Sequence, residues 1–158
     1  MLRRLVVLTV VAALGCGGRP ARPVPQSMTE TLNQFLAAVK ANNLNRMGDL
    51  WGTERGPATE WMEPELLRRR LTVIQKYLSH TGSRVVEGPI TPPGQGSGLR
   101  TYRVELQRDG CNRVLPIDLV QTRRGGWLVF DVHLESAGNP GIACQPGSGG
   151  TGGVGTRS

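Results

Sequence analysis

The chain has few of the residue types that usually build metal sites, catalytic sites or membrane spans. Of its 158 residues, two are histidine, three are cysteine and 4% are aromatic. The two histidines show no chelating spacing, so we expect no metal site and no cofactor. The sequence also has no glycine-rich phosphate loop and no nucleophile elbow. The composition excludes collagen, a coiled coil and a multi-span membrane protein.

Glycine and proline are plentiful instead, with 22 and 11 residues, and they mark the ends of the chain. Residues 16–26 form a proline-rich segment that we interpret as an extended spacer. Six of the last fourteen residues are glycine, so we expect the tail, residues 145–158, to be disordered. Residues 27–144 remain for one small globular domain.

The first sixteen residues resemble a bacterial lipoprotein signal. Arg3 and Arg4 precede a largely apolar run at residues 5–14, which is followed by Gly15 and Cys16. Ten residues rise only about 15 Å as a helix, half of a bilayer core of about 30 Å, which favours a cleaved signal peptide over a membrane span.

The segment Ala13-Leu14-Gly15-Cys16 resembles the lipobox, although the usual order of the first two residues is reversed. The resemblance implies cleavage after residue 15, diacylation of Cys16 and attachment to a membrane outside the cytoplasm, facing the periplasm or at the cell surface. The alternative is an ordinary signal peptide cut nearby, with Cys16 incidental.

The positive charge of the chain is scattered. The formal charge of +7 falls to +5 once Arg3 and Arg4 leave with the signal peptide, and no basic stripe with interleaved aromatics is present. We therefore expect no nucleic-acid partner. Attraction to anionic lipid or to a surface polymer stays open.

Apolar spacing predicts three helices in the first half of the domain. The first covers residues 28–41, where Ser27 and Glu30 form a capping box. The second covers residues 44–51. The third begins at Pro64 and buries a stripe at helical spacing, which consists of Leu67, Leu71, Ile74 and Leu78.

After Gly82 the apolar period changes to two, which predicts strands at residues 83–90, 99–108, 111–121 and 127–135. A two-residue turn at Asp109-Gly110 pairs Tyr102 with Ile117 and Val104 with Leu115. A four-residue loop at 123–126 pairs the last two strands, placing Leu115, Ile117 and Leu119 opposite Leu134, Val132 and Phe130. Because the two turns yield one continuous apolar face, we expect an antiparallel meander covered by the helices.

This order of elements resembles the nuclear transport factor 2-like superfamily. The resemblance is carried by TLNQFLAAV at residues 31–39, MGDLW at 47–51 and GWLVFDV at 126–132. It implies an α+β fold in which N-terminal amphipathic helices pack on a curved antiparallel sheet, a cystatin-like cone. The superfamily includes isomerase-like and dehydratase-like enzymes and many non-catalytic binding domains.

The residues argue more for binding than for catalysis. The predicted inner sheet face has no carboxylate and no histidine to transfer a proton. The outer face does carry titratable groups, with Asp118 opposite Asp131 and His133 nearby. Such carboxylates can share a proton or collect a cation, and a solvated face or an interface is the alternative.

Three aromatic residues are candidates for a ligand pocket. Trp51 and Trp61 flank the loop between the second and third helices, and Tyr102 has a hydroxyl that can reach a ligand at the rim. Ordinary core packing is the alternative for each of them.

The sequence therefore favours a non-catalytic domain that binds a small molecule, a peptide or an envelope partner. An isomerase-like or dehydratase-like enzyme and a purely structural component that forms a homodimer through the sheet stay open. If lipid consumes Cys16, Cys111 and Cys144 remain as a pair in an oxidising compartment. We expect them to form a disulfide, with two free thiols as the alternative.

Overall fold

The computed structural model describes residues 23–94, 96, 98–108 and 110–142. The predicted signal peptide, Cys16, Cys144 and the tail from residue 145 lie outside these ranges. None of the described helices combines the length and the hydropathy that crossing a bilayer requires.

The first helix, α1 (Met28–Lys40), begins where the sequence predicts. The Ser27 hydroxyl accepts a hydrogen bond from the backbone N–H of Glu30 at 3.4 Å. The return bond of the predicted capping box is replaced, because the Glu30 carboxylate accepts from Gln34 Nε2 at 2.7 Å instead. An i, i+4 side-chain pair on the helix surface thus competes with the cap.

The other two long helices also lie close to their predicted ranges. Helix α2 (Leu44–Leu50) is capped by Asn43, and α3 (Pro64–Leu78) is capped by Glu63, whose carboxylate accepts from two backbone N–H groups. The predicted stripe of α3 is confirmed, since Leu67, Leu71, Ile74 and Leu78 are its buried residues. Between α2 and α3 lie β1 (Gly52–Thr53), β2 (Gly56–Pro57) and the short 3₁₀ helix η1 (Ala58–Glu60).

Four antiparallel strands form the main sheet in the order β3-β4-β5-β6. They are β3 (Gly82–Ile90), β4 (Leu99–Arg108), β5 (Cys111–Gln121) and β6 (Trp127–Val132). The predicted register between β4 and β5 is confirmed, with Tyr102 opposite Ile117 and Val104 opposite Leu115.

The predicted register of the last hairpin is correct only in part. Asp118 pairs with Asp131 as predicted, but Leu119 pairs with Val129 because β6 carries a bulge at Phe130. Phe130 is consequently 42% exposed, whereas Leu128 and Val129 are fully buried, so its placement on the inner face is wrong. The loop between β5 and β6 is also one residue longer than predicted. Gln121 pairs with Trp127, so the loop consists of residues 122–126.

The last strand is shorter than the sequence suggests. The His133 N–H still donates to the carbonyl of Pro116 at 3.2 Å, but Pro116 has no N–H with which to return the bond. The ladder stops there and the chain enters α4 (Leu134–Ala137). The predicted pairing of Leu134 with Leu115 is therefore wrong.

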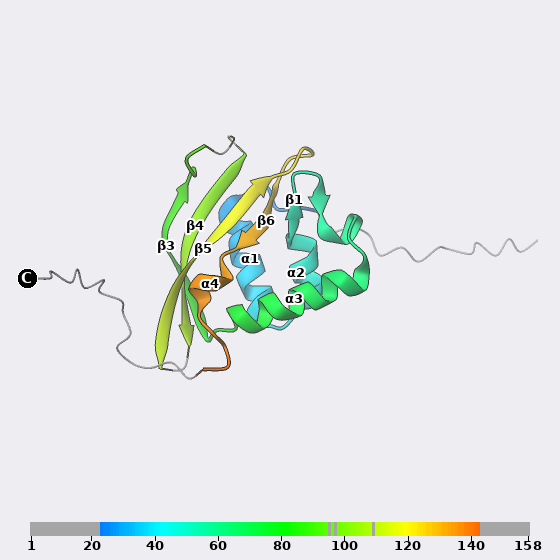
Figure 1. Cartoon of the computed structure of the whole chain (residues 1–158). Coiled ribbons are helices and arrows are strands. Elements are labelled where there is room, and N and C mark those ends of the chain that lie inside the picture. Colours follow the sequence, from blue (N-terminus) through cyan, green and yellow to red (C-terminus); the bar gives the residue numbers. More distant parts are fainter. Residues whose placement is uncertain (1–22, 95, 97, 109, 143–158) are drawn as a thin grey trace, which may run out of the picture.

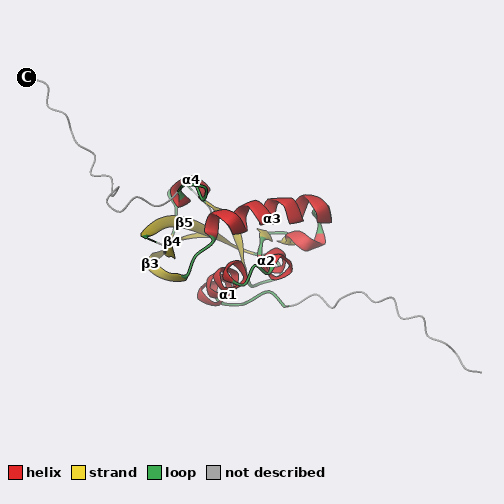
Figure 2. Cartoon of the chain, turned by 90° about the horizontal axis from the view of Figure 1, so that it is seen from below, coloured by secondary structure: helices red, strands yellow, loops and turns green. Residues whose placement is uncertain are grey.

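Helices α1, α2 and α3 lie together on one side of the curved sheet (Figure 1), and α2 lies between α1 and α3 (Figure 2). The side chains that fill the space between them form one hydrophobic core, to which α1, α2, α3 and the inner sheet face all contribute. The fold is thus the mixed α+β arrangement that the sequence predicts.

The two ends of the described chain lie at opposite ends of β5. At one end, the backbone of Pro25 accepts a hydrogen bond from the N–H of Trp127, just after the last hairpin. At the other end, Gly138 lies beside the side chain of Arg113. The part of β5 between Arg113 and Gln121, which lies opposite Trp127, spans about 26 Å at about 3.3 Å per residue.

Candidate functional site

A cleft of about 630 Å³ opens where α3 ends against the β4–β5 hairpin. Residues 137–142, which follow the last hairpin, form its other wall. Four side chains on this cleft are basic or titratable: Lys76, His80, Arg108 and Arg113. Among the described residues that line it there is no Asp or Glu.

Arg108 fixes the geometry of the cleft. Its Nε donates to the carbonyl of Ser79 at 2.9 Å, and its two terminal nitrogens donate to the carbonyls of Tyr77 and Ala137. The last carbonyls of a helix lack partners within the helix and carry partial negative charge, so a guanidinium satisfies them well. Burial, together with the charge of Arg113, lowers the pKa of Arg108 from its ordinary value. Arg108 therefore ties α3, α4 and β4 together.

His80 follows the end of α3. Its Nδ1 lies 2.7 Å from the carbonyl oxygen of Leu78, and because a carbonyl can only accept, Nδ1 is the donor in this bond. Burial is the main cause that lowers the pKa of His80, and the charges of Lys40 and Arg108 add to it. The neutral ring then leaves Nε2 as a hydrogen-bond acceptor.

Arg113 and Lys76 supply charge that is not neutralised nearby. Neither side chain forms a hydrogen bond or ion pair with another described residue. Arg113 runs beside Gly138, whose φ of +73° is a conformation that favours glycine. The cleft is thus an electropositive site with at least two cations available to a ligand.

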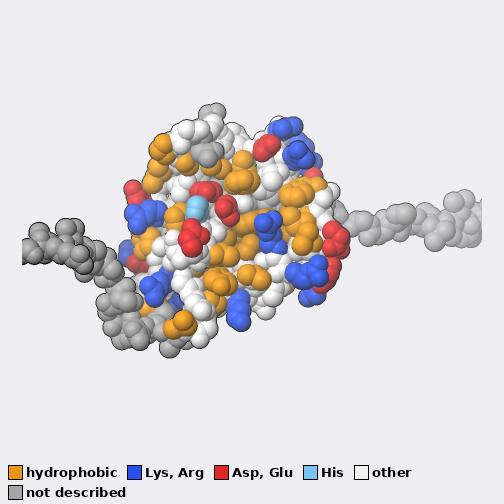
Figure 3. All heavy atoms as spheres, viewed as in Figure 1, with side chains coloured by type: hydrophobic (Ala, Val, Ile, Leu, Met, Phe, Trp, Pro, Cys, Tyr) orange, Lys and Arg blue, Asp and Glu red, His pale blue; other side chains and the backbone are white. Residues whose placement is uncertain are grey.

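A second cluster of titratable groups lies on the outer sheet face (Figure 3). His133 Nε2 lies 3.1 Å from Asp118 Oδ2, and His133 Nδ1 lies 3.1 Å from Glu135 Oε1. The Thr101 hydroxyl donates to the other oxygen of Asp118 at 2.6 Å. Burial opposes the charge on His133, but the two carboxylates outweigh burial and raise its pKa above the ordinary value.

This cluster resembles a structural clamp more than a catalytic centre. Both nitrogens of His133 are occupied, and the hydroxyl of Thr101 donates to Asp118, so the histidine cannot take its proton. Within the described ranges, no group of three or more His, Cys, Asp or Glu side chains is arranged to hold a metal ion. The contacts instead hold the junction of β6 and α4 against β5.

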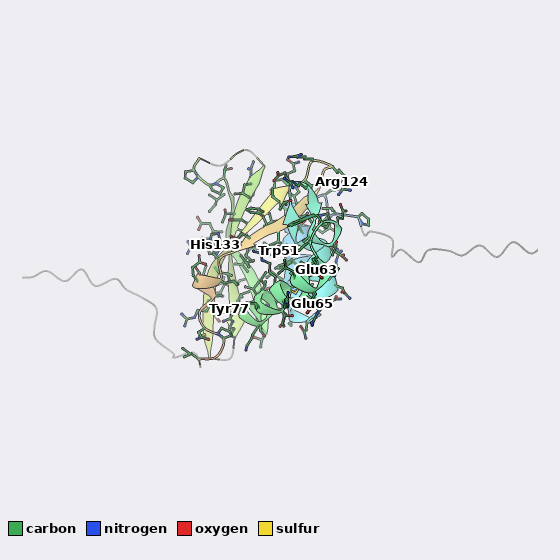
Figure 4. All side chains as sticks on the ribbon, turned by 45° about the vertical axis from the view of Figure 1, so that its right-hand side comes forward. Trp51, Glu63, Glu65, Tyr77, Arg124 and His133 are labelled. Atoms are coloured by element: carbon green, nitrogen blue, oxygen red, sulfur yellow. The ribbon has the colours of Figure 1, made fainter. Side chains whose placement is uncertain are left out.

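The three aromatic residues predicted to line a pocket are not brought together. Trp51 and Tyr102 are 5% and 4% exposed, and Trp51 packs on Phe35 with ring centroids 6.1 Å apart. Trp61 is 48% exposed, and its Nε1 donates to the carbonyl of Gly56 at 3.2 Å. Trp51 and His133 are both labelled in Figure 4, where Trp51 lies between the sheet and the helices. None of the three lines the cleft.

Sequence reasoning did not find the cleft, although its residues stand at recognisable positions. His80 comes two residues after Leu78, the last residue of the predicted stripe, and Arg108 and Arg113 flank the predicted turn at Asp109-Gly110. What the sequence does not show is that the helix end meets this turn. That meeting depends on the tertiary packing of α3 and on the Arg108 contacts.

The comparisons with known proteins support the fold. No protein-family model matches the chain, and no curated protein matches it. A crystal structure of a cystatin-like protein from Ruminococcus gnavus ATCC 29149 matches with a TM-score of 0.50 and 14% sequence identity. The match covers 87% of this chain and 47% of that protein, so the chain spans about half the length of its neighbour. At this identity the likeness shows a cystatin-like α+β fold.

Proposed function

We propose that this chain is a lipid-anchored protein outside the cytoplasm. Its domain binds a ligand and is not catalytic. The observation that carries the proposal is the electropositive cleft, because its unpaired cations are placed for a partner rather than for the fold. The ligand is a small molecule, a peptide or a segment of an envelope partner.

The filled interior of the sheet supports binding over catalysis. An isomerase-like or dehydratase-like enzyme of the superfold would need an acid or base in a pocket lined by the inner sheet face. Here that face carries fully buried aliphatic side chains that belong to the core, namely Val104, Leu106, Leu115, Ile117 and Leu119. The cleft lies outside this core, beyond the end of α3.

The proposed anchor fits the position of the cleft. Pro23 follows Cys16 by seven positions, which corresponds to a reach of about 24 Å for a fully extended chain. Pro23 and Val24 lie near the hairpin at residues 122–126, which is the end of β5 remote from the cleft. A tether at Cys16 would thus hold the hairpin end near the membrane and leave the cleft open to the surroundings.

Replacing Cys16 tests the anchor. We expect Cys16→Ser to release the protein from the membrane fraction or to block its processing, because acyl chains supply about 0.8 kcal/mol for each buried methylene. Cys111→Ser is the matched control and should leave partitioning unchanged. If Cys16→Ser partitions like the wild type, the lipoprotein proposal is wrong.

We also propose the disulfide between Cys111 and Cys144. Cys111 opens β5, and the chain after α4 passes Arg113 at Gly138, with Ile142 two residues short of Cys144. The bridge would close a loop of about 32 residues, contribute about 3 kcal/mol in the chain-entropy model and pin the cleft wall at residues 137–142.

Thiol labelling without reductant tests this bridge in protein purified from the envelope. We expect no reactive thiol at Cys111 or Cys144 until reductant is added. Labelling of both cysteines in the untreated protein would show that the bridge does not form.

A further inference from the structure

We propose that the cleft recognises an oxyanion, a carboxylate or a phosphate on its ligand, and that Arg113 and Lys76 bind it. This inference rests on the proposed binding function and names the chemical class of the ligand.

The contrast with other arginines of the domain supports the assignment. Six arginines that lie elsewhere on the described surface each have an acidic partner within 4 Å. The pairs are Arg46–Asp49, Arg68–Glu65, Arg84–Glu105, Arg103–Glu87, Arg123–Glu54 and Arg124–Glu60. Arg113 has no such partner among the described residues, and neither do the exposed Arg69 and Arg70, but Arg113 is half-buried in a cleft that no described acidic side chain lines. A cation in a concave site without a counter-charge attracts an anion more strongly than one on a flat surface.

The cations of the cleft divide into one that holds the fold and two that are free. Arg108 uses three of its five N–H donors on the carbonyls of Tyr77, Ser79 and Ala137, so its position is fixed by the fold and it contributes mainly positive potential to a ligand. Arg113 keeps its planar fork of N–H groups, which matches the two oxygens of a carboxylate or phosphate. Lys76 adds a second, mobile point charge from α3.

His80 makes the site sensitive to pH. The charged groups that face it are Lys40 on α1, Arg108 on β4, and Lys76 and Arg113 on the cleft wall, and all are cationic. A bound anion offsets these charges and favours the protonated ring, whose Nε2 then becomes a donor. Binding should therefore tighten as the pH falls through the pKa of His80, which burial holds below 6.5.

The test is an NMR titration of the full chain in detergent with inorganic phosphate in one arm and acetate in the other. We expect amide shifts at residues 76–81 and 137–142 with one or both anions, and the tighter arm identifies the source of the oxyanion. Arg113→Gln or Lys76→Gln should weaken binding about tenfold, because each removes a charge-assisted hydrogen bond.

Arg69→Gln is the control, since it removes the same charge from an exposed position of α3 outside the cleft. It should leave the affinity within about twofold of the wild type. Lys76 is exposed, so Lys76→Gln should not disturb folding. It therefore still tests the site if Arg113→Gln fails to fold.

Three results overturn the inference. Equal weakening by Arg69→Gln and by the cleft variants would show that only the net charge matters. A neutral ligand that co-purifies and shifts the cleft amides, while neither anion does, would refute the oxyanion and keep the binding function. Cleft amides that respond neither to the anions nor to any co-purifying molecule would refute both.

Discussion

At the scale of the residue, the two histidines show how the surroundings of one side-chain type can shift its pKa in opposite directions. His133 lies between Asp118 and Glu135 and has a raised pKa, whereas His80 is buried among cations and has a lowered pKa. The first favours its charged form and the second its neutral form. Their contributions to stability therefore depend on pH with opposite sign.

His133 should stabilise the fold more in acid than in base. Because its folded pKa is raised, its contribution is fully present below the unfolded value of about 6.5 and is lost as the pH rises through the folded pKa. We expect the loss of unfolding free energy in His133→Gln to be larger at about pH 5.5 than at about pH 8.5. Urea denaturation of both proteins measures this difference, which also cancels the opposing contribution of His80. An equal loss at both pH values would show that the clamp is not ionic.

At the scale of the element, α3 has two faces that a substitution can tell apart. Leu71 and Ile74 are 2% and 4% exposed in the core, whereas Leu66 on the same helix is 51% exposed. We expect Leu71→Ala or Ile74→Ala to cost about 2–5 kcal/mol of unfolding free energy. Leu66→Ala, the matched control, should change it by less than about 0.5 kcal/mol. Losses of similar size at Leu66 and Leu71 would contradict the packing of α3.

The bulge in β6 makes a second prediction at this scale. Leu128→Ala should destabilise the protein by about 2–5 kcal/mol because Leu128 is fully buried. Phe130→Ala should cost much less, since that ring is 42% exposed. The reverse order, measured by chemical denaturation, would restore the plain alternation that the sequence suggests.

These two elements also show what a sequence can predict here. The stripe of α3 follows from its own 3.6-residue period, and the β4–β5 register follows from a two-residue turn, so both are local information. The bulge at Phe130 and the end of β6 depend on the partner strand, where Pro116 cannot donate. The cleft is harder to predict from the sequence, because it forms only where the end of α3 packs near Arg108 and Arg113, which are distant in the sequence.

At the scale of the whole molecule, the cleft and the first described residues, 23–25, lie at opposite ends of the sheet. The Pro25–Trp127 contact fixes the start of the domain at the hairpin end, and the Arg108 contacts fix the cleft at the other end. A short tether would then present the cleft away from the membrane. The proposed anchoring and the proposed ligand binding can therefore be tested separately.

Native mass spectrometry of the protein extracted from its own membrane tests this account most directly, because one spectrum reports both the anchor and the ligand. We predict a chain that begins at Cys16, carries acyl chains and retains a bound molecule that Arg113→Gln releases and Arg69→Gln does not. A chain without acyl groups and without any bound molecule would contradict the account.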